Sequence, residues 1–493
     1  MNGTASARYR FGDPARASLL LGLSLRQSIP LVVGVLWLTL WLMVGLAAVG
    51  LVGPLVGLGF AFGRWRRAPL FDVAGPGMRL WWTGRRHRSP WAKGSLLGAG
   101  PGFEDDLPES LAGLEMLDAP IDWQAGRRGV AVVRDRRAGS VSIVMQVTGA
   151  GFPVASLREQ DGLVAGWGAA LGPLARAQCP VSRITWQEWA HPIGVSGHRE
   201  FLDGLDRASS SAASNDYEQL LDLQGPFTIA HEVLLTLTVD IRRVRTRRRE
   251  PLAAAIDTLT DEARLLVSRL ESAGLRVDGP LETLELSTAI RLRSDPSRTA
   301  QVSSVRRSLA AATRRGAIEW GPMAVEPRWD VVSVDGSMHR SFRIAGWPML
   351  PVGADWMAPL LAGDGATRTV TVVLEPVPLQ RAAADANRQL TSIEADHAQK
   401  ERHGFRLTAR ERRRQTDVET RERELAEGHP EFRHAGIVTV TAAGTEELDD
   451  ACARVEQAAA QSMLDLRPLV ARQADGWVAS LPMGRSFTTG ARA

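Results

Sequence analysis

Residues that could carry out catalysis are few in this sequence of 493 residues, and none of them stands in a catalytic motif. The chain has two lysines, and a Walker-type phosphate-binding loop needs a lysine between a glycine and a serine or threonine. Lys93 is followed by Gly94, and Lys400 lies in a long run of charged residues. These 493 residues therefore contain no Walker-type nucleotide site.

Metal ligands and nucleophiles are equally scattered. The nine histidines form no His-Glu-x-x-His pair, and the only cysteines, Cys179 and Cys452, lie far apart. His191 and His198 lie within twenty residues of Cys179, but they lack the clustered spacing of a zinc site, so structural roles are favoured. The segment from Gly194 to His198 lacks the spacing of a nucleophile elbow. We expect no catalysis, no metal and no cofactor, and the two isolated thiols fit a reduced, cytosolic compartment.

The densest charge in the chain is a run of arginines behind a β-rich stretch. The chain has a formal net charge of +4 and a sequence pI of about 9.6. Basic clusters can neutralise nucleic-acid phosphates, and a solvated edge or a face toward an acidic partner is the open alternative. The candidates for contact with a partner or with nucleic acid are Arg242, Arg243, Arg245, Arg247, Arg248 and Arg249.

One hydrophobic stretch stands out from the rest of the chain. From Ile29 to Gly63 there are 35 consecutive residues without a charge, and Gly50, Gly53 and Pro54 fall just past the middle. One membrane-spanning helix needs about 20 apolar residues, and glycine and proline break helices. We therefore expect a transmembrane helical hairpin, from Pro30 to Val49 and back from Val52 to Phe62. A buried core hairpin is the alternative, and the short second arm leaves full crossing open.

Basic residues flank both ends of this stretch, so the positive-inside rule places both ends, and the rest of the chain, in the cytoplasm. The expected location is the inner membrane, with a multi-pass anchor. From Arg64 to Lys93 basic residues alternate with tryptophans, which indicates a segment on the lipid surface, with nucleic-acid binding as the alternative. The predicted membrane-interface residues are Arg26, Arg64, Trp65, Arg66, Arg67, Trp81 and Trp82.

The remainder of the chain shows the same order of elements twice. Each half contains a β-hairpin, a helix, a strand, a helix, a strand and a helix. The resulting fold class is α+β: an N-terminal transmembrane helical hairpin, then two repeated antiparallel-sheet α+β modules. The second module carries a long charged helical arm from Arg381 to Glu427, whose apolar spacing does not hold a coiled-coil heptad. Such an arm is suited to contact with a partner subunit.

These patterns divide the chain into six parts. The predicted parts are a cytoplasmic N-terminal segment (1–28), the hairpin (29–63), a basic, Trp-rich juxtamembrane segment and linker (64–108), the first α+β module (109–273), a helical connector (274–325) and the second module with its arm (326–493).

Several short stretches resemble parts of conjugative type IV secretion machines. The lead-in from Gly22 to Pro30 resembles that of PrgI-like subunits, which are small two-helix membrane proteins. Further stretches resemble the N-terminal, non-motor domain of type IV secretion ATPases, and these are Phe227–Asp240, Ser341–Pro348 with Leu360 and Leu361, Thr445–Met463, and Trp477–Gly484. End to end, the chain resembles a membrane protein of actinobacterial conjugative elements that joins a PrgI-like hairpin to such a domain.

The resemblance implies a scaffold rather than an enzyme, because the catalytic motor of that family has no counterpart in these residues. The implied function is a membrane-anchored, cytoplasm-facing subunit of a conjugative type IV secretion-like apparatus that docks a separate secretion ATPase. Its expected partners are that ATPase, channel membrane subunits and the lipid bilayer, and a homo-oligomer is open. The alternative is a membrane-tethered DNA-binding or DNA-guiding protein, for which the arginine run is the discriminating feature.

Overall fold

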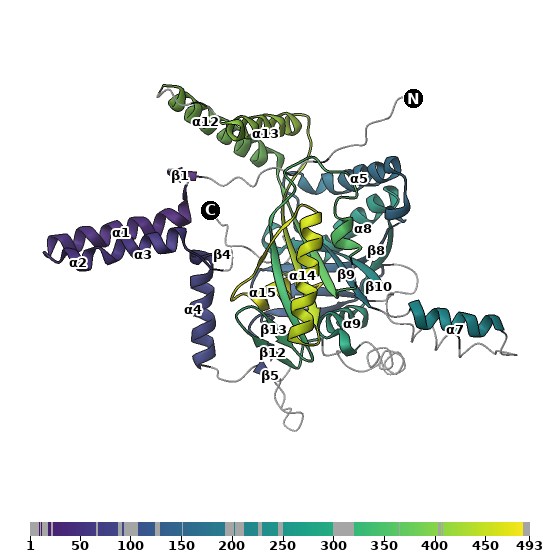
Figure 1. Ribbon diagram of the computed structural model, residues 1–493. Coiled ribbons are helices and arrows are strands. Elements are labelled where there is room, and N and C mark those ends of the chain that lie inside the picture. The colour runs from purple at the N-terminus through teal and green to yellow at the C-terminus, as the bar shows by residue number, and fades with distance from the viewer. Residues whose placement is uncertain are drawn as a thin grey trace.

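A large antiparallel sheet forms the centre of the protein, and the chain is α+β (Figure 1). The computed structural model describes residues 9, 11, 18–20, 23–65, 68–86, 91–92, 107–123, 129–149, 151–192, 202, 212–224, 229–244, 250–298, 320–363, 365–402, 406 and 408–486. The sheet has 13 strands, in the order β5-β12-β13-β14-β16-β15-β9-β10-β8-β7-β6, with β11 paired to β8 and β17 paired to β14.

The strands come from two halves of the chain. The first half contributes β6 (Leu114–Ala119), β7 (Val130–Asp135), β8 (Ser140–Thr148), β9 (Val181–Pro192), β10 (Ile229–Asp240) and β11 (Arg276–Pro280). The second half contributes β12 (Ala324–Pro327), β13 (Val332–Val334), β14 (Ser337–Gly346), β15 (Arg368–Val377), β16 (Glu431–Ala442) and β17 (Asp465–Pro468). The short strand β5 (Trp91–Ala92) extends the edge beside β12.

The sheet order is symmetric about the pairing of β9 with β15. On one side of this pair follow β10, β8 and β7, and on the other β16, β14 and β13. The pairing runs from Arg368 opposite Ala190 to Leu374 opposite Ile184, which places Gln187 opposite Thr371 at its centre. The sequence predicts two modules, each built on its own sheet. The structure instead joins both halves in one sheet, because β9 of the first half pairs with β15 of the second.

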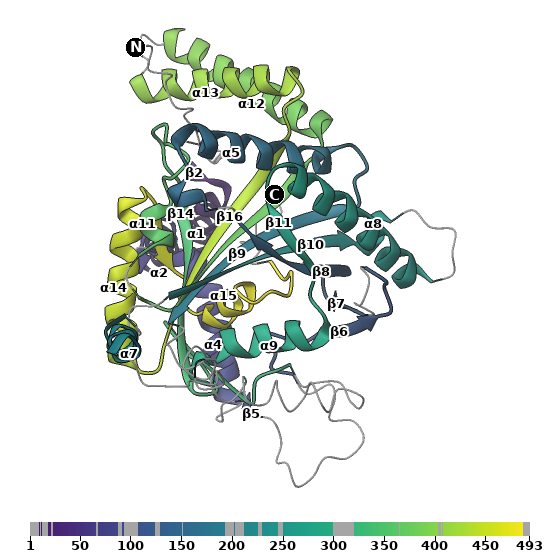
Figure 2. The same ribbon diagram turned by 90° about the vertical axis from the view of Figure 1, so that its right-hand side faces the viewer.

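Helices cover both faces of the sheet (Figure 2). One face carries α5 (Leu157–Leu171), α8 (Pro251–Ser272), α11 (Ala358–Leu361) and α14 (Thr445–Gln461). The other carries α9 (Thr283–Ser294) and α15 (Gln473–Ala479). Along β10, Leu235, Leu237 and Val239 point toward α8, as the period-two pattern predicts. Trp186 on β9 contacts the cores of both halves, so the two cores are continuous at the centre of the sheet.

The face beneath α9 and α15 is rich in hydroxyl groups. Thr236 and Thr238 alternate with the apolar residues of β10, and Thr371 and Thr439 do so on the second half. An exposed polar face would be the ordinary outcome of such alternation. Here these side chains are buried, because α15 and the segment 480–485 after it, called the strap below, lie across this face.

Three further helices project from the sheet body (Figure 1). Helix α7 (Ala212–Gln224) lies between β9 and β10, and the arm of α12 (Leu379–Arg402) and α13 (Ala409–Ala426) lies between β15 and β16. The two helices of the arm pack against each other, with Ala382, Ala386 and Leu425 buried between them and Val377 of β15. The arm therefore occupies the same place in the second half that α7 occupies in the first.

The apolar stretch near the N-terminus forms short helices. Helix α1 (Leu25–Met43) is followed by a turn in which Gly45 has a φ of +80°, and then by α2 (Ala47–Gly50) and α3 (Val52–Phe62). The turn lies before the predicted break at Gly50 to Pro54, whereas the predicted second arm, Val52 to Phe62, has the bounds of α3. Around these helices lie β1 (Ser18–Leu20), β2 (Leu23–Ser24), β3 (Arg64–Trp65), β4 (Ala68–Pro69) and α4 (Leu70–Arg86).

The lengths of α1 and α3 contradict the expected membrane crossing. Because α1 begins with polar residues, its apolar part starts at Ile29 and is about 15 residues long, against the roughly 20 that a span needs. Helix α3 has 11 residues. Within the part of the chain that the structure describes, no helix combines the length and the apolar composition that a membrane crossing requires. The predicted transmembrane hairpin, and with it the multi-pass inner-membrane location, is therefore wrong.

Candidate partner-binding surfaces

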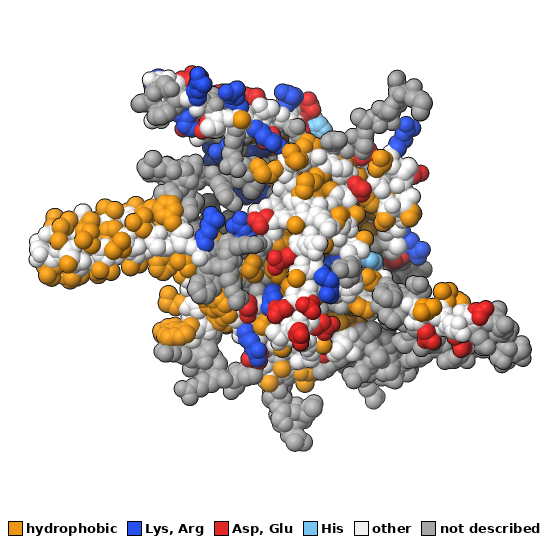
Figure 3. Space-filling view, viewed as in Figure 1, with side chains coloured by type: hydrophobic (Ala, Val, Ile, Leu, Met, Phe, Trp, Pro, Cys, Tyr) orange, Lys and Arg blue, Asp and Glu red, His pale blue; other side chains and the backbone are white. Residues whose placement is uncertain are grey.

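The helices α1 to α3, called the apolar hairpin below, form the most apolar surface of the protein. In Figure 3 they project from the body as a rod covered with hydrophobic side chains. Leu55 is 67% exposed and Leu36 is 61% exposed. Monomeric proteins rarely expose contiguous apolar patches of this kind, and such patches mark interaction sites. The apolar hairpin is therefore the first candidate for a docking surface.

Glycines allow α1 and α3 to approach each other closely. A Cβ atom at Gly57 would lie 2.6 Å from the carbonyl oxygen of Pro30, and one at Gly34 would lie 2.7 Å from that of Gly53. At Gly59, by contrast, a Cβ would meet nothing within 4 Å. Close backbone approach through small residues fixes the two helices side by side, so that their larger apolar side chains point outward.

The predicted membrane-interface residues that the structure describes belong to α1, β3 and α4. Arg64 is exposed, and Trp81 and Trp82 on α4 are about half exposed. Arg26 belongs to α1 and Trp65 to β3, while Arg66 and Arg67 lie outside the described residues. Helix α4 is attached to the sheet body, because Val73 forms a small buried cluster with Val470. This segment thus joins the hairpin to the body.

The arginine run is only partly described. Arg242 makes two hydrogen bonds of 3.1 Å to the carboxylate of Asp240, and Arg243 donates to the carbonyl oxygen of Val181. Burial by itself raises the pKa of Asp240, but hydrogen bonds and the charge of Arg242 outweigh it and lower that pKa. The first two arginines are therefore engaged with the protein itself. Arg245, Arg247, Arg248 and Arg249 lie outside the described residues.

The residues considered for catalysis or metal binding serve the fold where the structure describes them. The ring of His191 stacks on Trp189 with centroids 3.7 Å apart, and the guanidinium of Arg293 lies 4.7 Å from the Trp189 ring centroid. Arg293 is buried and donates to Glu232 at 2.9 Å, which fastens α9 to the sheet. His198 lies outside the described residues.

The two cysteines are both buried and free. Burial raises the pKa of the Cys452 thiol to about 11, so it is protonated and unreactive at neutral pH. Among the described residues, no group of three or more His, Cys, Asp or Glu side chains is placed to hold a metal ion.

A second candidate surface is an aromatic slot that the sequence analysis missed. The slot is formed by Trp347, Trp356 and His434, and the ring of Phe11 lies in it. Phe11 stacks on Trp347 with centroids 5.4 Å apart and meets Trp356 edge-on at 5.0 Å. Two residues earlier, Tyr9 pairs with Val352 through two backbone hydrogen bonds. The only available signal was a pair of aromatic residues in an otherwise polar segment.

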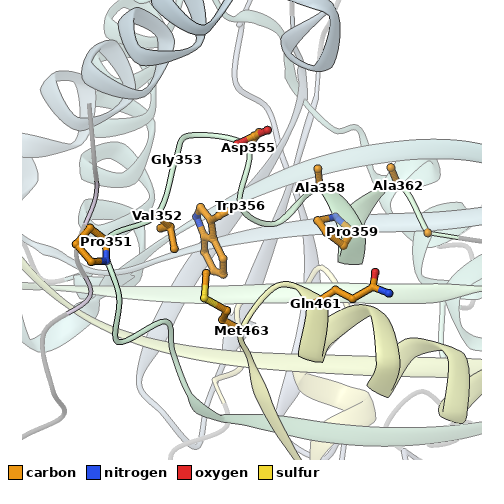
Figure 4. Close-up of a pocket in the computed structure, with 11 residues that line it drawn as sticks. Pro351, Val352, Gly353, Asp355, Trp356, Ala358, Pro359, Ala362, Gln461 and Met463 are labelled. Carbon is orange, nitrogen blue, oxygen red and sulfur yellow. The ribbon is translucent and has the colours of Figure 1, made fainter. Parts of the chain in front are cut away.

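An open groove of about 740 Å³ continues from this slot (Figure 4). Its lining includes Val352 and Trp356, which also contact the N-terminal segment, together with Pro359, Gln461 and Met463. In Figure 4 the side chain of Met463 points toward the Trp356 indole. The groove thus adjoins the backbone of Val352, which pairs with Tyr9, and it has aromatic and flexible apolar side chains, a composition suited to binding an extended peptide.

The surfaces that stand out on the described part of the chain are the exposed apolar hairpin, the groove beside the aromatic slot and the projecting helices (Figure 1). A comparison of the sequence with protein-family models and with curated proteins finds no match.

Proposed function

We propose that this chain is a scaffold subunit of a conjugative type IV secretion-like apparatus, which docks a separate secretion ATPase and small channel subunits and carries out no catalysis of its own. The observation that carries the proposal is that the apolar hairpin is exposed, although the sheet body beside it has its own buried core. A surface of that kind is stable only when another molecule covers it.

The positions of the stretches that resemble secretion ATPases support the choice of partner. Phe227–Asp240 includes β10, which pairs with a strand on each side, and Thr445–Met463 includes α14, which covers the second half. Trp477–Gly484 includes the end of α15 and most of the strap, which are buried against the sheet. The resemblance therefore falls on elements that build the core, and a related domain would share this framework.

The experiment is an affinity purification of the full chain from its native cells after chemical cross-linking, followed by mass spectrometry. We expect recovery of a Walker-motif ATPase together with small apolar subunits. The variant Leu55→Arg places a charge on the exposed hairpin. The amount of small subunits recovered with it should fall at least tenfold. The matched control is Leu265→Arg on α8, where Leu265 is also exposed, and it should retain them.

Three outcomes would contradict the proposal. Recovery of nuclease-sensitive DNA without an ATPase would favour the DNA-guiding function instead. If the isolated chain cofractionated with lipid vesicles and no partner protein were recovered, the hairpin would not be a protein-docking surface. Enzymatic turnover by the isolated chain would exclude a purely structural scaffold.

A further inference from the structure

We propose that the aromatic slot and its groove form a docking site for an extended Tyr-x-Phe segment, and that in an assembly this segment is supplied by residues 9–11 of a second copy of the chain. The segment of Tyr9 and Phe11 is called the N-terminal hook below. The copies would then be linked in series, with the hook of each copy bound in the slot of the next. This inference goes beyond the scaffold function, since it concerns self-assembly rather than docking of the ATPase.

Backbone pairing provides the register of the hook. The amide of Tyr9 donates to the carbonyl oxygen of Val352 at 2.9 Å, and the amide of Val352 donates back to Tyr9 at 3.0 Å. A pair of reciprocal hydrogen bonds is the unit of antiparallel strand addition, in which the main chain supplies affinity and alternate side chains supply specificity.

The side chains of the hook provide its specificity. Phe11 contacts three rings, Trp347, Trp356 and His434, and these rings also contact one another, with Trp347 and His434 at 4.7 Å and 89°. The Tyr9 hydroxyl donates to Asp161 of α5 at 3.3 Å. A site that holds one aromatic ring among three others and gives a second ring a carboxylate partner discriminates against segments without both residues.

The occupant seen in the structure identifies the ligand. Every copy of the chain carries the same hook and the same slot, so the contacts made within one chain can be made equally between two. Residues 12–24 connect Phe11 to α1, and a fully extended connection of that length reaches about 50 Å at most. An exchanged hook would therefore hold the start of α1 of one copy within about 50 Å of the slot of the next.

Two variants test whether oligomers form through the hook, and the oligomeric state of the wild-type protein separates exchange from an internal clip. The variant Phe11→Ala keeps the slot but weakens the hook, and Trp356→Ala keeps the hook but opens the slot. We expect wild-type protein to form oligomers and each variant alone to be mostly monomeric. An equimolar mixture should form one-to-one dimers, because one intact hook meets one intact slot. Mass is measured by size-exclusion chromatography with light scattering, after thermal unfolding has shown that both variants are folded.

A synthetic peptide of residues 5–15 provides a test that does not depend on variant stability. It should bind Phe11→Ala protein and dissociate wild-type oligomers, whereas the same peptide with alanine at positions 9 and 11 should do neither. Peptide-sensitive oligomers and mixed dimers would support exchange. The proposal is overturned if wild-type protein stays monomeric even though the peptide binds, whatever the mixture does, since the hook would then be an internal clip. It is also overturned if oligomers persist unchanged in excess peptide.

Discussion

At the scale of single residues, the buried His339 shows how completely the hydroxyl-rich face of the sheet is closed. Its Nε2 donates to the carbonyl oxygen of Ser294 at 2.8 Å, so its Nδ1 is the acceptor for the Thr441 hydroxyl at 2.9 Å. Burial lowers the pKa of His339 from 6.5 to about 4, although Ser294 and Asp295 act in the opposite direction. The histidine therefore stays neutral in the folded protein at neutral pH.

This residue predicts a pH dependence of stability. Between pH 6.5 and about 4 the unfolded chain binds a proton at His339 that the folded chain does not, so stability falls as the pH is lowered through this window. The loss is on the order of 3 kcal/mol at most. The free energy of unfolding, measured by urea denaturation at pH 7, 5.5 and 4.5, should fall less steeply in His339→Gln. The exposed control His429→Gln should follow wild type, and an unchanged slope in His339→Gln would contradict the assignment.

At the scale of elements, the apolar hairpin depends on its glycines. Gly57 faces the backbone of α1 at Pro30, whereas Gly59, two residues further on the same helix, faces open space. The pairing of α1 with α3 thus rests on close approach of backbones, as in small-residue helix interfaces generally. The sequence pattern alone does not distinguish these two glycines.

The pair of glycines provides a matched test. Gly57→Leu should force α3 away from α1, while Gly59→Leu should leave the pairing intact and differ only in surface. Hydrogen exchange of the amides in residues 25–62, read by mass spectrometry, should be at least tenfold faster in the first variant and unchanged in the second. Equal protection in both variants would show that the helices do not pack through Gly57.

At the scale of the whole molecule, the two halves hold each other through reciprocal contacts. After α9 of the first half, Asp295 accepts hydrogen bonds from Gly336 and Ser337 in the β13–β14 turn. After α15 of the second half, Arg485 donates twice at 2.9 Å to Asp135, which precedes the β7–β8 turn. Each half therefore fastens a hairpin of the other, β13–β14 in one case and β7–β8 in the other.

Between these two contacts the strap passes the centre of the sheet. The Nε2 group of Gln187 donates to the carbonyl oxygens of Leu481 at 3.1 Å and of Ala479 at 3.3 Å. Irregular backbone can be buried only if its polar groups find partners, and the hydroxyl-rich strands with Gln187 offer such partners. The polar residues of this face are thus needed because the buried backbone of the strap must have hydrogen-bond partners.

The Arg485–Asp135 contact predicts a large coupling between distant parts of the sequence. Arg485→Ala leaves a buried carboxylate without its main partner, which should cost about 3 kcal/mol of unfolding free energy. Asp135→Asn combined with Arg485→Ala should cost less than the sum of the single changes, a difference measured by urea denaturation in a double-mutant cycle. The control Arg467→Ala removes a more exposed pair with Asp465 and should cost about 1 kcal/mol or less. Additive effects of the first pair would refute the reciprocal fastening.

The sequence by itself determined the features that depend on neighbouring residues. Period-two alternation indicated which residues of β10 share a face, and the order of elements indicated a repeat. It also identified the apolar stretch from Ile29, although not its division at Gly45. Each of these signals is carried by residues a few positions apart, where local geometry decides the outcome.

Only the tertiary structure decided which surfaces meet. Gln187 and Thr371 are 184 positions apart, and no local pattern states that β9 pairs with β15 to make one sheet instead of two. Alternation marks a polar face but does not say whether solvent or the strap covers it. The aromatic slot likewise joins Phe11 to His434, more than 400 positions away, because the packing of the whole fold places them together. Long-range pairing depends on the complete set of competing contacts, which a short stretch of sequence does not contain.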